Sequence, residues 1–165
     1  MRAFSYNYFE SPLGKIEIRW DEEGIYAFHF MNEGAALKPE SEKTPVFVTE
    51  SLQQLGNYFN GNLKQFDLRL QFRGTDFQNK VWQELANIPF GKTLSYLQLA
   101  RKLGDEKCIR AAASANGRNP FAIVIPCHRV IGSNGNLTGY AGELWRKQWL
   151  LEHEARICGT FQQLF

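Results

Sequence analysis

The hydrophobic period of this chain changes near residue 75, and this change restricts the fold more than any other feature. Before it, short segments alternate apolar and polar residues: GKIEIRW at 14–20 and, after the turn DEEG, IYAFHF at 25–30. Alternation of this kind is typical of half-buried strands, so the two segments predict a β-hairpin. Residues 48–61 predict a short helix, and the alternating FDLRLQF at 66–72 predicts a further strand that completes the small sheet.

From residue 75 onward the apolar residues follow a helical period. The helix predicted at 75–88 begins with a capping box, Thr75 with Gln78, and a second box, Ser95 with Gln98, begins a helix at 95–104. A short helix at 107–117 and an amphipathic helix at 144–157 follow. The predicted fold class is therefore α+β: a small β-rich N-terminal lobe (an antiparallel sheet with a helix, residues 1–72) followed by a helical C-terminal lobe (residues 73–165).

The composition limits the location and the cofactors. The chain is 44% hydrophobic and 22% charged, as is usual for globular proteins, and no apolar stretch is long enough to span a membrane. Its three cysteines are widely spaced and form no C-x-x-C pair, and its three histidines are scattered, which argues against a disulfide framework and a structural zinc site. We therefore expect a cytoplasmic protein with no metal ion and no cofactor.

The charge is divided unevenly between the two halves. Residues 1–72 carry 7 basic and 10 acidic side chains, whereas residues 73–165 carry 12 basic and 7 acidic ones. A basic C-terminal half is a modest indication of a polyanionic partner such as nucleic acid. A surplus of this size also occurs on ordinary protein surfaces, so charge alone does not decide between the two.

The helices at 95–104 and 107–117 form a pair with small residues at their junction. Ala100 and Gly104 would let the two helices cross closely, as in a helix-turn-helix, although an ordinary helical hairpin has the same pattern. In the second helix the run Ala111–Ser114 presents almost no side chain, so a large flat partner could approach its backbone. Arg110 is the one long cation beside this run, and it is either a side chain inserted into a groove or a solvated surface charge.

The segment FAIVIPCHRVIG at 121–132 places Cys127 directly before His128 and Arg129. A thiolate nucleophile needs a nearby base or cation, but most buried cysteines are ordinary core residues. Adjacent side chains of an extended segment point apart, so a turn or a bridging water would be needed between the cysteine and the histidine. A histidine base also needs an orienting carboxylate, and spacing does not choose among three candidates: Glu143, Glu152 and Glu154.

Several segments together resemble one family. The sequence RNPFAIVIPCHRVIGSNGNLTGYAG at 118–142, with SYLQLA at 95–100 and WLLEHE at 149–154, resembles the O6-alkylguanine-DNA alkyltransferases, whose signature is Pro-Cys-His-Arg-Val. The resemblance is continuous from about residue 75 to 157 and extends weakly to SPLGKIEI at 11–18. It implies direct, stoichiometric repair of O6-alkylguanine, and of O4-alkylthymine, in double-stranded DNA. It further implies a chain that acts as a monomer, with cooperative binding along DNA left open, and that does not associate with membranes.

The resemblance also implies roles for individual residues. Cys127 corresponds to the alkyl acceptor, His128 to the base that acts through a water, and Glu154 to the carboxylate that orients the histidine. Asn119 corresponds to the asparagine that holds the turn, and Tyr96 to the tyrosine that donates to the leaving base and helps to rotate the nucleotide out. The helix pair is implied to bind the minor groove, with DNA contacts from Tyr96, Arg110, Ala111, Ala112, Ala113 and Ser114, and the pocket for the base is implied to involve Val130, Tyr140 and Ala141.

The chain departs from the family at some positions. Ala141 stands where some relatives have serine, Glu143 where glycine is frequent, and Ala122 where the mammalian forms have proline, so the range of alkyl groups stays open. The mammalian zinc ligands have no counterpart here. Three other functions would use parts of the same pattern: a non-catalytic binder of damaged DNA, which lacks the cysteine, a cysteine hydrolase, and a helix-turn-helix regulator with a structural cysteine.

Overall fold

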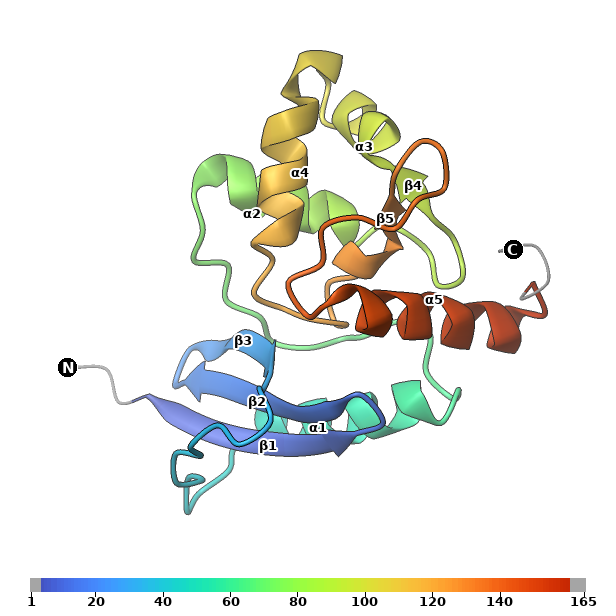
Figure 1. The fold of residues 1–165 in the computed structure, drawn as a ribbon. Helices are drawn as coiled ribbons and strands as arrows, with labels where there is room; N and C mark the ends of the chain where they lie inside the picture. Colours follow the sequence, from blue (N-terminus) through green and yellow to red (C-terminus); the bar gives the residue numbers. More distant parts are fainter. Residues whose placement is uncertain (1–3, 161–165) are drawn as a thin grey trace. The chain divides into compact units, whose positions relative to one another are not determined.

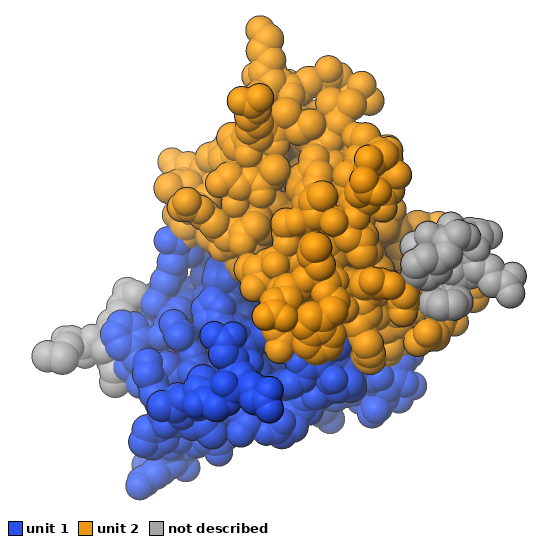
Figure 2. All heavy atoms as spheres, viewed as in Figure 1, with its two compact units in different colours: residues 1–73, 120–122 blue, residues 74–119, 123–165 orange. Residues whose placement is uncertain are grey.

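The computed structural model of the chain describes residues 4–160 and consists of two compact units (Figure 2). Unit 1 contains residues up to 73 together with 120–122, and unit 2 contains residues 74–119 and those from 123 onward. The predicted lobes also include residues 1–3 and 161–165, which lie outside the described residues. Within residues 4–160 no helix is both long enough and apolar enough to cross a membrane.

Unit 1 is an antiparallel sheet with one helix. The strands β1 (Ser5–Ser11), β2 (Gly14–Asp21) and β3 (Gly24–Phe30) pair in the order β1-β2-β3, and α1 (Val46–Phe59) follows (Figure 1). The predicted hairpin is β2 and β3, and β1 adds an edge strand that the sequence analysis had not assigned. Aromatic contacts join α1 to the sheet: Phe9 stacks on Phe59, and Trp20 meets Phe47 edge-on, both at 6.0 Å between ring centroids.

The strand predicted at 66–72 is wrong. This segment forms only an isolated bridge, Leu70 with Ile25, because two short segments share the outer edge of β3. Ile25 exchanges hydrogen bonds with the backbone of residues 69 and 71, whereas Phe28 exchanges them with Pro120 and Ala122. The alternation of FDLRLQF correctly indicates an extended segment beside the sheet, but the edge of β3 that it would need is partly taken by residues 120–122.

Unit 2 contains the remaining helices in the predicted order. They are α2 (Asp76–Leu85), α3 (Tyr96–Lys102), α4 (Ile109–Gly117) and α5 (Leu144–Cys158), with 3₁₀ turns at Glu106–Cys108 and Cys127–Arg129 (Figure 1). Both predicted capping boxes are present, at the first residues of α2 and α3. The Trp82 indole of α2 donates to the Ala115 carbonyl of α4 over 2.8 Å, which fixes these two helices together. The predicted α+β fold class is confirmed.

A short parallel pair of strands places the start of α3 beside the cysteine segment. β4 (Leu94–Ser95) pairs with β5 (Val130–Ile131), and β5 directly follows the 3₁₀ turn that begins at Cys127. α5 turns one face inward, made of Lys147, Leu150, Leu151, Glu154 and Ala155. Helical spacing thus puts a lysine and a glutamate, two turns apart, on the buried face of the same helix.

The contribution of the predicted capping box of α2 to stability can be tested by mutation. The Thr75 side chain accepts a hydrogen bond from the Gln78 backbone N–H over 3.1 Å, and the Gln78 side chain accepts from the Thr75 N–H over 3.0 Å. Thr75→Ala should lower the free energy of unfolding by about 1 kcal/mol, because one of the first N–H groups of the helix loses its partner. Thr75→Ser should retain most of the stability. Equal stability of Thr75→Ala and the parent chain in urea denaturation would contradict a contribution from the cap.

Candidate active site

The cysteine predicted as the nucleophile lies in a tight turn. The Cys127 N–H donates to the Ile125 carbonyl over 2.8 Å, which closes an inverse γ-turn around Pro126 (φ −81°, ψ 62°). The 3₁₀ turn Cys127–Arg129 continues from it, so adjacent side chains do not simply alternate as they would in a strand. Cys127 is buried, with 6% of its surface exposed, whereas Cys108 is half-buried and Cys158 is exposed.

Two asparagines from the end of α4 and the residues after it hold this turn. The Asn119 side chain donates to the Ile125 carbonyl over 2.8 Å, and that of Asn116 donates to the Cys127 carbonyl over 3.5 Å. Of these two asparagines, only Asn119 was predicted from the sequence. Asn116 is 2% exposed and lies on the buried face of α4 with Ala112 and Ala115, so helical spacing from these alanines was the available signal.

His128, Arg129 and Glu154 form a buried cluster. His128 Nε2 lies 2.7 Å from Glu154 Oε2, and Arg129 holds the same carboxylate with two hydrogen bonds: Nε to Oε1 at 2.8 Å and Nη2 to Oε2 at 3.0 Å. His128 and Glu154 are at most 1% exposed. Among the three candidate carboxylates, the structure brings only Glu154 to the histidine; Glu152 accepts from Gln148 and Glu143 from Trp145.

Burial and charge set the protonation states of the cluster. Burial raises the pKa of Cys127, although a hydrogen bond from Asn119 and the charge of Lys147 act in the opposite direction, so the resting thiol is protonated. Burial lowers the pKa of His128, and Glu154 offsets this only in part. Burial alone would raise the pKa of Glu154, but His128 and Arg129 outweigh it and hold this pKa well below its usual range. The cluster is therefore a neutral imidazole beside an ionised carboxylate.

Lys147 is the cation whose charge lowers the pKa of Cys127, and it was not among the residues predicted from the sequence. Its side chain is fully buried on α5, and its Nζ donates to the Thr138 carbonyl over 2.8 Å. Burial lowers its pKa to about 8, and the negative charge of a Cys127 thiolate raises it. Its position seven residues before Glu154 on the buried face of α5 is the signal that could have found it.

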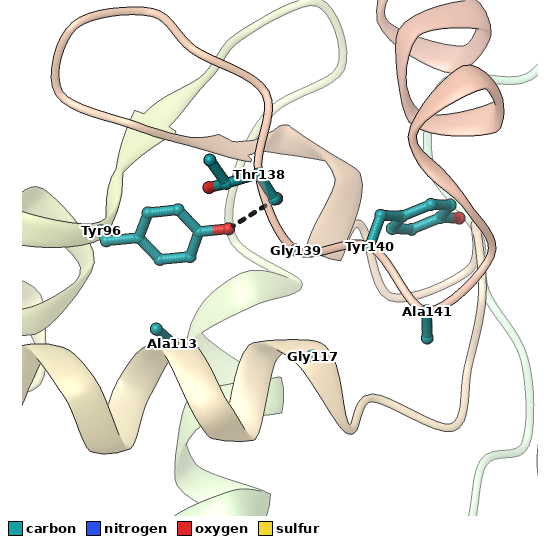
Figure 3. A pocket seen from close by; sticks show the side chains of 7 residues that line it. All are labelled: Tyr96, Ala113, Gly117, Thr138, Gly139, Tyr140 and Ala141. Atoms are coloured by element: carbon teal, nitrogen blue, oxygen red, sulfur yellow. Dashed lines mark hydrogen bonds between the residues drawn. The ribbon is translucent and has the colours of Figure 1, made fainter.

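A cavity of about 510 Å³ lies between α4 and the loop that precedes α5 (Figure 3). Tyr96 Oη donates to the Thr138 carbonyl over 3.1 Å, the same carbonyl that accepts from Lys147. The cavity is lined by Tyr96, Ala113, Gly117, Thr138, Gly139, Tyr140 and Ala141. Burial raises the pKa of Tyr140 well above its usual value, and the charge of a Cys127 thiolate would raise it further. Of the predicted pocket residues, Tyr140 and Ala141 line the cavity, whereas Val130 is buried in β5.

The residues predicted to contact DNA do not all face solvent. Arg110, Ala111 and Ser114 are exposed, and Ala113 is partly exposed and lines the cavity. Ala112 is completely buried, because it shares the inner face of α4 with Ala115 and Asn116. The Ala112 side chain therefore faces the core, and a DNA contact at this residue stays a prediction that concerns its backbone. The other histidines have contacts of their own: His153 stacks on Trp149, and His29 pairs across the sheet with Glu17.

Fold and site together define an α+β protein with a buried cysteine that directly precedes a histidine paired with a buried carboxylate. Comparison with known proteins identifies the family. The family described as 6-O-methylguanine DNA methyltransferase matches in two parts, the ribonuclease-like domain at residues 4–72 and the DNA binding domain at residues 76–156. The chain belongs to this family.

The similarity to individual relatives extends along most of their lengths. A methylated-DNA–protein-cysteine methyltransferase of Methanosarcina acetivorans is 46% identical over 90% of this chain and 97% of the relative. One from Mycolicibacterium paratuberculosis is 53% identical over 74% of each chain. The crystal structure of the Mycobacterium tuberculosis O6-methylguanine methyltransferase has a TM-score of 0.83 and 37% identity, covering 93% of this chain and 94% of that one. The Mycobacterium tuberculosis protein in complex with DNA has a TM-score of 0.80 and 39% identity, covering 97% and 98%.

The buried lysine gives a testable dependence of stability on pH. Since the pKa of Lys147 falls from 10.5 to about 8 on folding, the unfolded chain binds more protons between these values. The contribution of this group to the free energy of unfolding therefore rises with pH across that window and is most unfavourable below it. Lys147→Met should be more stable than the parent chain at about pH 7, and the difference should shrink towards about pH 10 in urea denaturation.

Lys107→Met, which removes an exposed lysine, is the matched control and should change stability little at either pH. A Lys147→Met chain that is less stable than the parent by the same amount at both pH values would contradict the prediction. Such a result would mean that the hydrogen bond to Thr138 outweighs the cost of burying the ammonium group.

Proposed function

We propose that this chain repairs double-stranded DNA by transferring an alkyl group, above all methyl, from O6 of guanine or O4 of thymine to Cys127. The observation that carries the proposal is that buried Cys127 directly precedes His128 in one turn and that His128 pairs with the buried Glu154. The same unit contains a cavity that Tyr96 and α4 help to line. Relatives with 42–53% identity that are named methylated-DNA–protein-cysteine methyltransferase support this reaction, and the mycobacterial complex with DNA supports the partner.

The reaction requires a thiolate, and the site contains the groups to make one. His128 donates its Nε2 proton to Glu154, which leaves the Nδ1 lone pair as an acceptor; within the described residues this buried atom has no hydrogen-bond partner. We infer that Nδ1 takes the Cys127 proton through a water molecule. The charge of Lys147 and the Asn119 hydrogen bond then stabilise the thiolate.

The transfer itself is an in-line displacement at the alkyl carbon. A carbon–sulfur bond forms as the carbon–oxygen bond breaks, and the electron pair of that bond leaves with the base. Protonation of the departing base lowers the barrier, and Tyr96 is the donor, since its hydroxyl lies in the lining of the cavity. In the free chain this hydroxyl donates to Thr138, so it must exchange that partner for the base. The product is a stable thioether, so each chain reacts once.

Access to O6 of guanine requires the nucleotide to leave the stacked duplex. We infer that α3 and α4 act as a helix-turn-helix in the minor groove, where the exposed Ala111 and Ser114 permit close approach and Arg110 fills the gap left by the rotated nucleotide. Residues 73–165 would then be the DNA-binding and alkyl-acceptor domain, and residues 1–72 an accompanying lobe. The chain would act on DNA as a monomer.

Mass spectrometry tests the acceptor directly. After incubation with duplex DNA that contains O6-methylguanine, the peptide with Cys127 should gain the mass of one methyl group in place of hydrogen, in a one-to-one ratio with chain. Cys127→Ser should gain no mass and should still bind the DNA, because its fold and exposed helices are unchanged. Repeated turnover, or an adduct on Cys108 or Cys158 in place of Cys127, would overturn the assignment.

Arg110 tests nucleotide extrusion separately from chemistry. Arg110→Ala should react about tenfold more slowly with O6-alkylguanine in duplex DNA, a loss of about 1.4 kcal/mol, because unstacking is no longer compensated. Its reaction with the free O6-alkylguanine base should be nearly unchanged. Arg156→Ala is the matched control: it removes an exposed arginine from α5 instead of α4 and should alter neither rate. Equal losses on both substrates would contradict a role in extrusion.

A further inference from the structure

Glu154 binds more donors than a histidine-orienting carboxylate requires. Its Oε2 receives His128 Nε2 at 2.7 Å and Arg129 Nη2 at 3.0 Å, while its Oε1 receives Arg129 Nε at 2.8 Å and the Gly91 N–H at 3.1 Å. A carboxylate has about four acceptor positions, so those of Glu154 are filled. Two of the four donors belong to one guanidinium group.

Arg129 is directed to this carboxylate and not to the cysteine. Its third nitrogen, Nη1, donates to the Ile88 carbonyl over 2.6 Å, and the guanidinium lies 5.6 Å from the centre of the Phe90 ring. The side chain is buried, with 5% of its surface exposed. A planar guanidinium that is fixed on three sides holds a carboxylate in one orientation, which a lysine ammonium cannot do to the same extent.

The position of this cation affects what the histidine can do. A buried histidine paired with a carboxylate alone is stabilised as imidazolium, and an imidazolium cannot accept the proton of a thiol. The charged groups that act on His128 are Glu154 and Lys147 from α5 and Arg129 from its own turn, in which the thiol-bearing Cys127 directly precedes the histidine. Two cations therefore act against one anion, and Arg129 is the cation that contacts this anion directly.

We propose that Arg129 is a positioning residue for the transfer reaction: by pairing with both oxygens of Glu154, it lets the carboxylate orient His128 while the imidazole stays neutral, with its proton on Nε2. The inference rests on the proposed function, since it explains why His128 is ready to accept the Cys127 proton. It differs from a purely structural role, in which Arg129 would only link α5 to the cysteine turn and to Ile88.

Nuclear magnetic resonance of the chain without DNA tests the protonation state, with ¹⁵N-labelled histidine. In the parent chain His128 should be neutral and protonated on Nε2 from about pH 5.5 to about pH 8. In Arg129→Met it should titrate within that range, because the Glu154 carboxylate then loses the cation that pairs with both its oxygens. Arg129→Lys, which restores a positive charge, should return His128 to the neutral form. His153 and His29 serve as internal references.

The rate of methyl transfer to Cys127 gives the second readout. Arg129→Met should react about tenfold more slowly at a pH one unit below its new midpoint, and should recover towards the parent rate at higher pH. Arg129→Lys should react at a rate between the two. A structural role alone would lower the melting temperature while leaving the pH midpoint of the rate and the titration of His128 unchanged, which would overturn the proposal.

Two outcomes separate this inference from the function on which it rests. If the parent chain transfers no methyl group at any pH, the proposed function fails, whatever the state of His128. If the parent chain transfers methyl but its own His128 is an imidazolium at neutral pH, or is protonated on Nδ1, the inference about Arg129 fails alone. The protonation state of His128 in the parent chain is measured without any variant, so it can overturn the inference even if Arg129→Met does not fold.

Discussion

The buried carboxylate of Glu154 is the interaction on which the site depends. An ionised group in this position loses nearly all its hydration, a cost of several kcal/mol that only close donors can offset. The donors come from separate parts of the chain: the Gly91 N–H from the loop after α2, and His128 and Arg129 from the cysteine turn. Because the carboxylate itself belongs to α5, satisfying it fixes the last helix, that loop and the turn in one geometry.

Burial would also keep Cys127, the proposed nucleophile, unreactive at rest. Burial raises the pKa of Cys127, so the resting group is a thiol, which is a weak nucleophile and oxidises slowly. Lys147 is held nearby with its own pKa lowered to about 8, so a charged ammonium is also unfavourable there. Forming the thiolate gives each of the two buried groups an opposite charge as a partner. In the proposed reaction each chain reacts once, so such an arrangement would protect the acceptor, because oxidation of the thiol to a sulfinic or sulfonic acid would be an irreversible loss.

The sequence predicted the elements whose signals are local and missed those that depend on distant partners. The capping boxes at Thr75 and Ser95 involve residues three apart, and both are present. The strand at 66–72 failed because alternation marks an extended segment without showing that residues 120–122 already bind part of the β3 edge. For the same reason Arg129 was noted only as a neighbour of Cys127: its partner Glu154 lies 25 residues away, and nothing local indicates that contact.

The backbone at Glu143 shows how the cavity is connected to the helix that carries Lys147 and Glu154. Glu143 has φ 74° and ψ 147°, a conformation almost restricted to glycine, and it lies between the cavity-lining residues 138–141 and the first residue of α5. Such a conformation costs about 1–3 kcal/mol in a residue with a Cβ. Its side chain accepts a hydrogen bond from the Trp145 indole over 2.8 Å, and its carbonyl accepts from the first turn of α5, contacts that offset part of the strain. The direction in which the loop enters α5 is therefore imposed by the surrounding contacts and not by the preference of this residue.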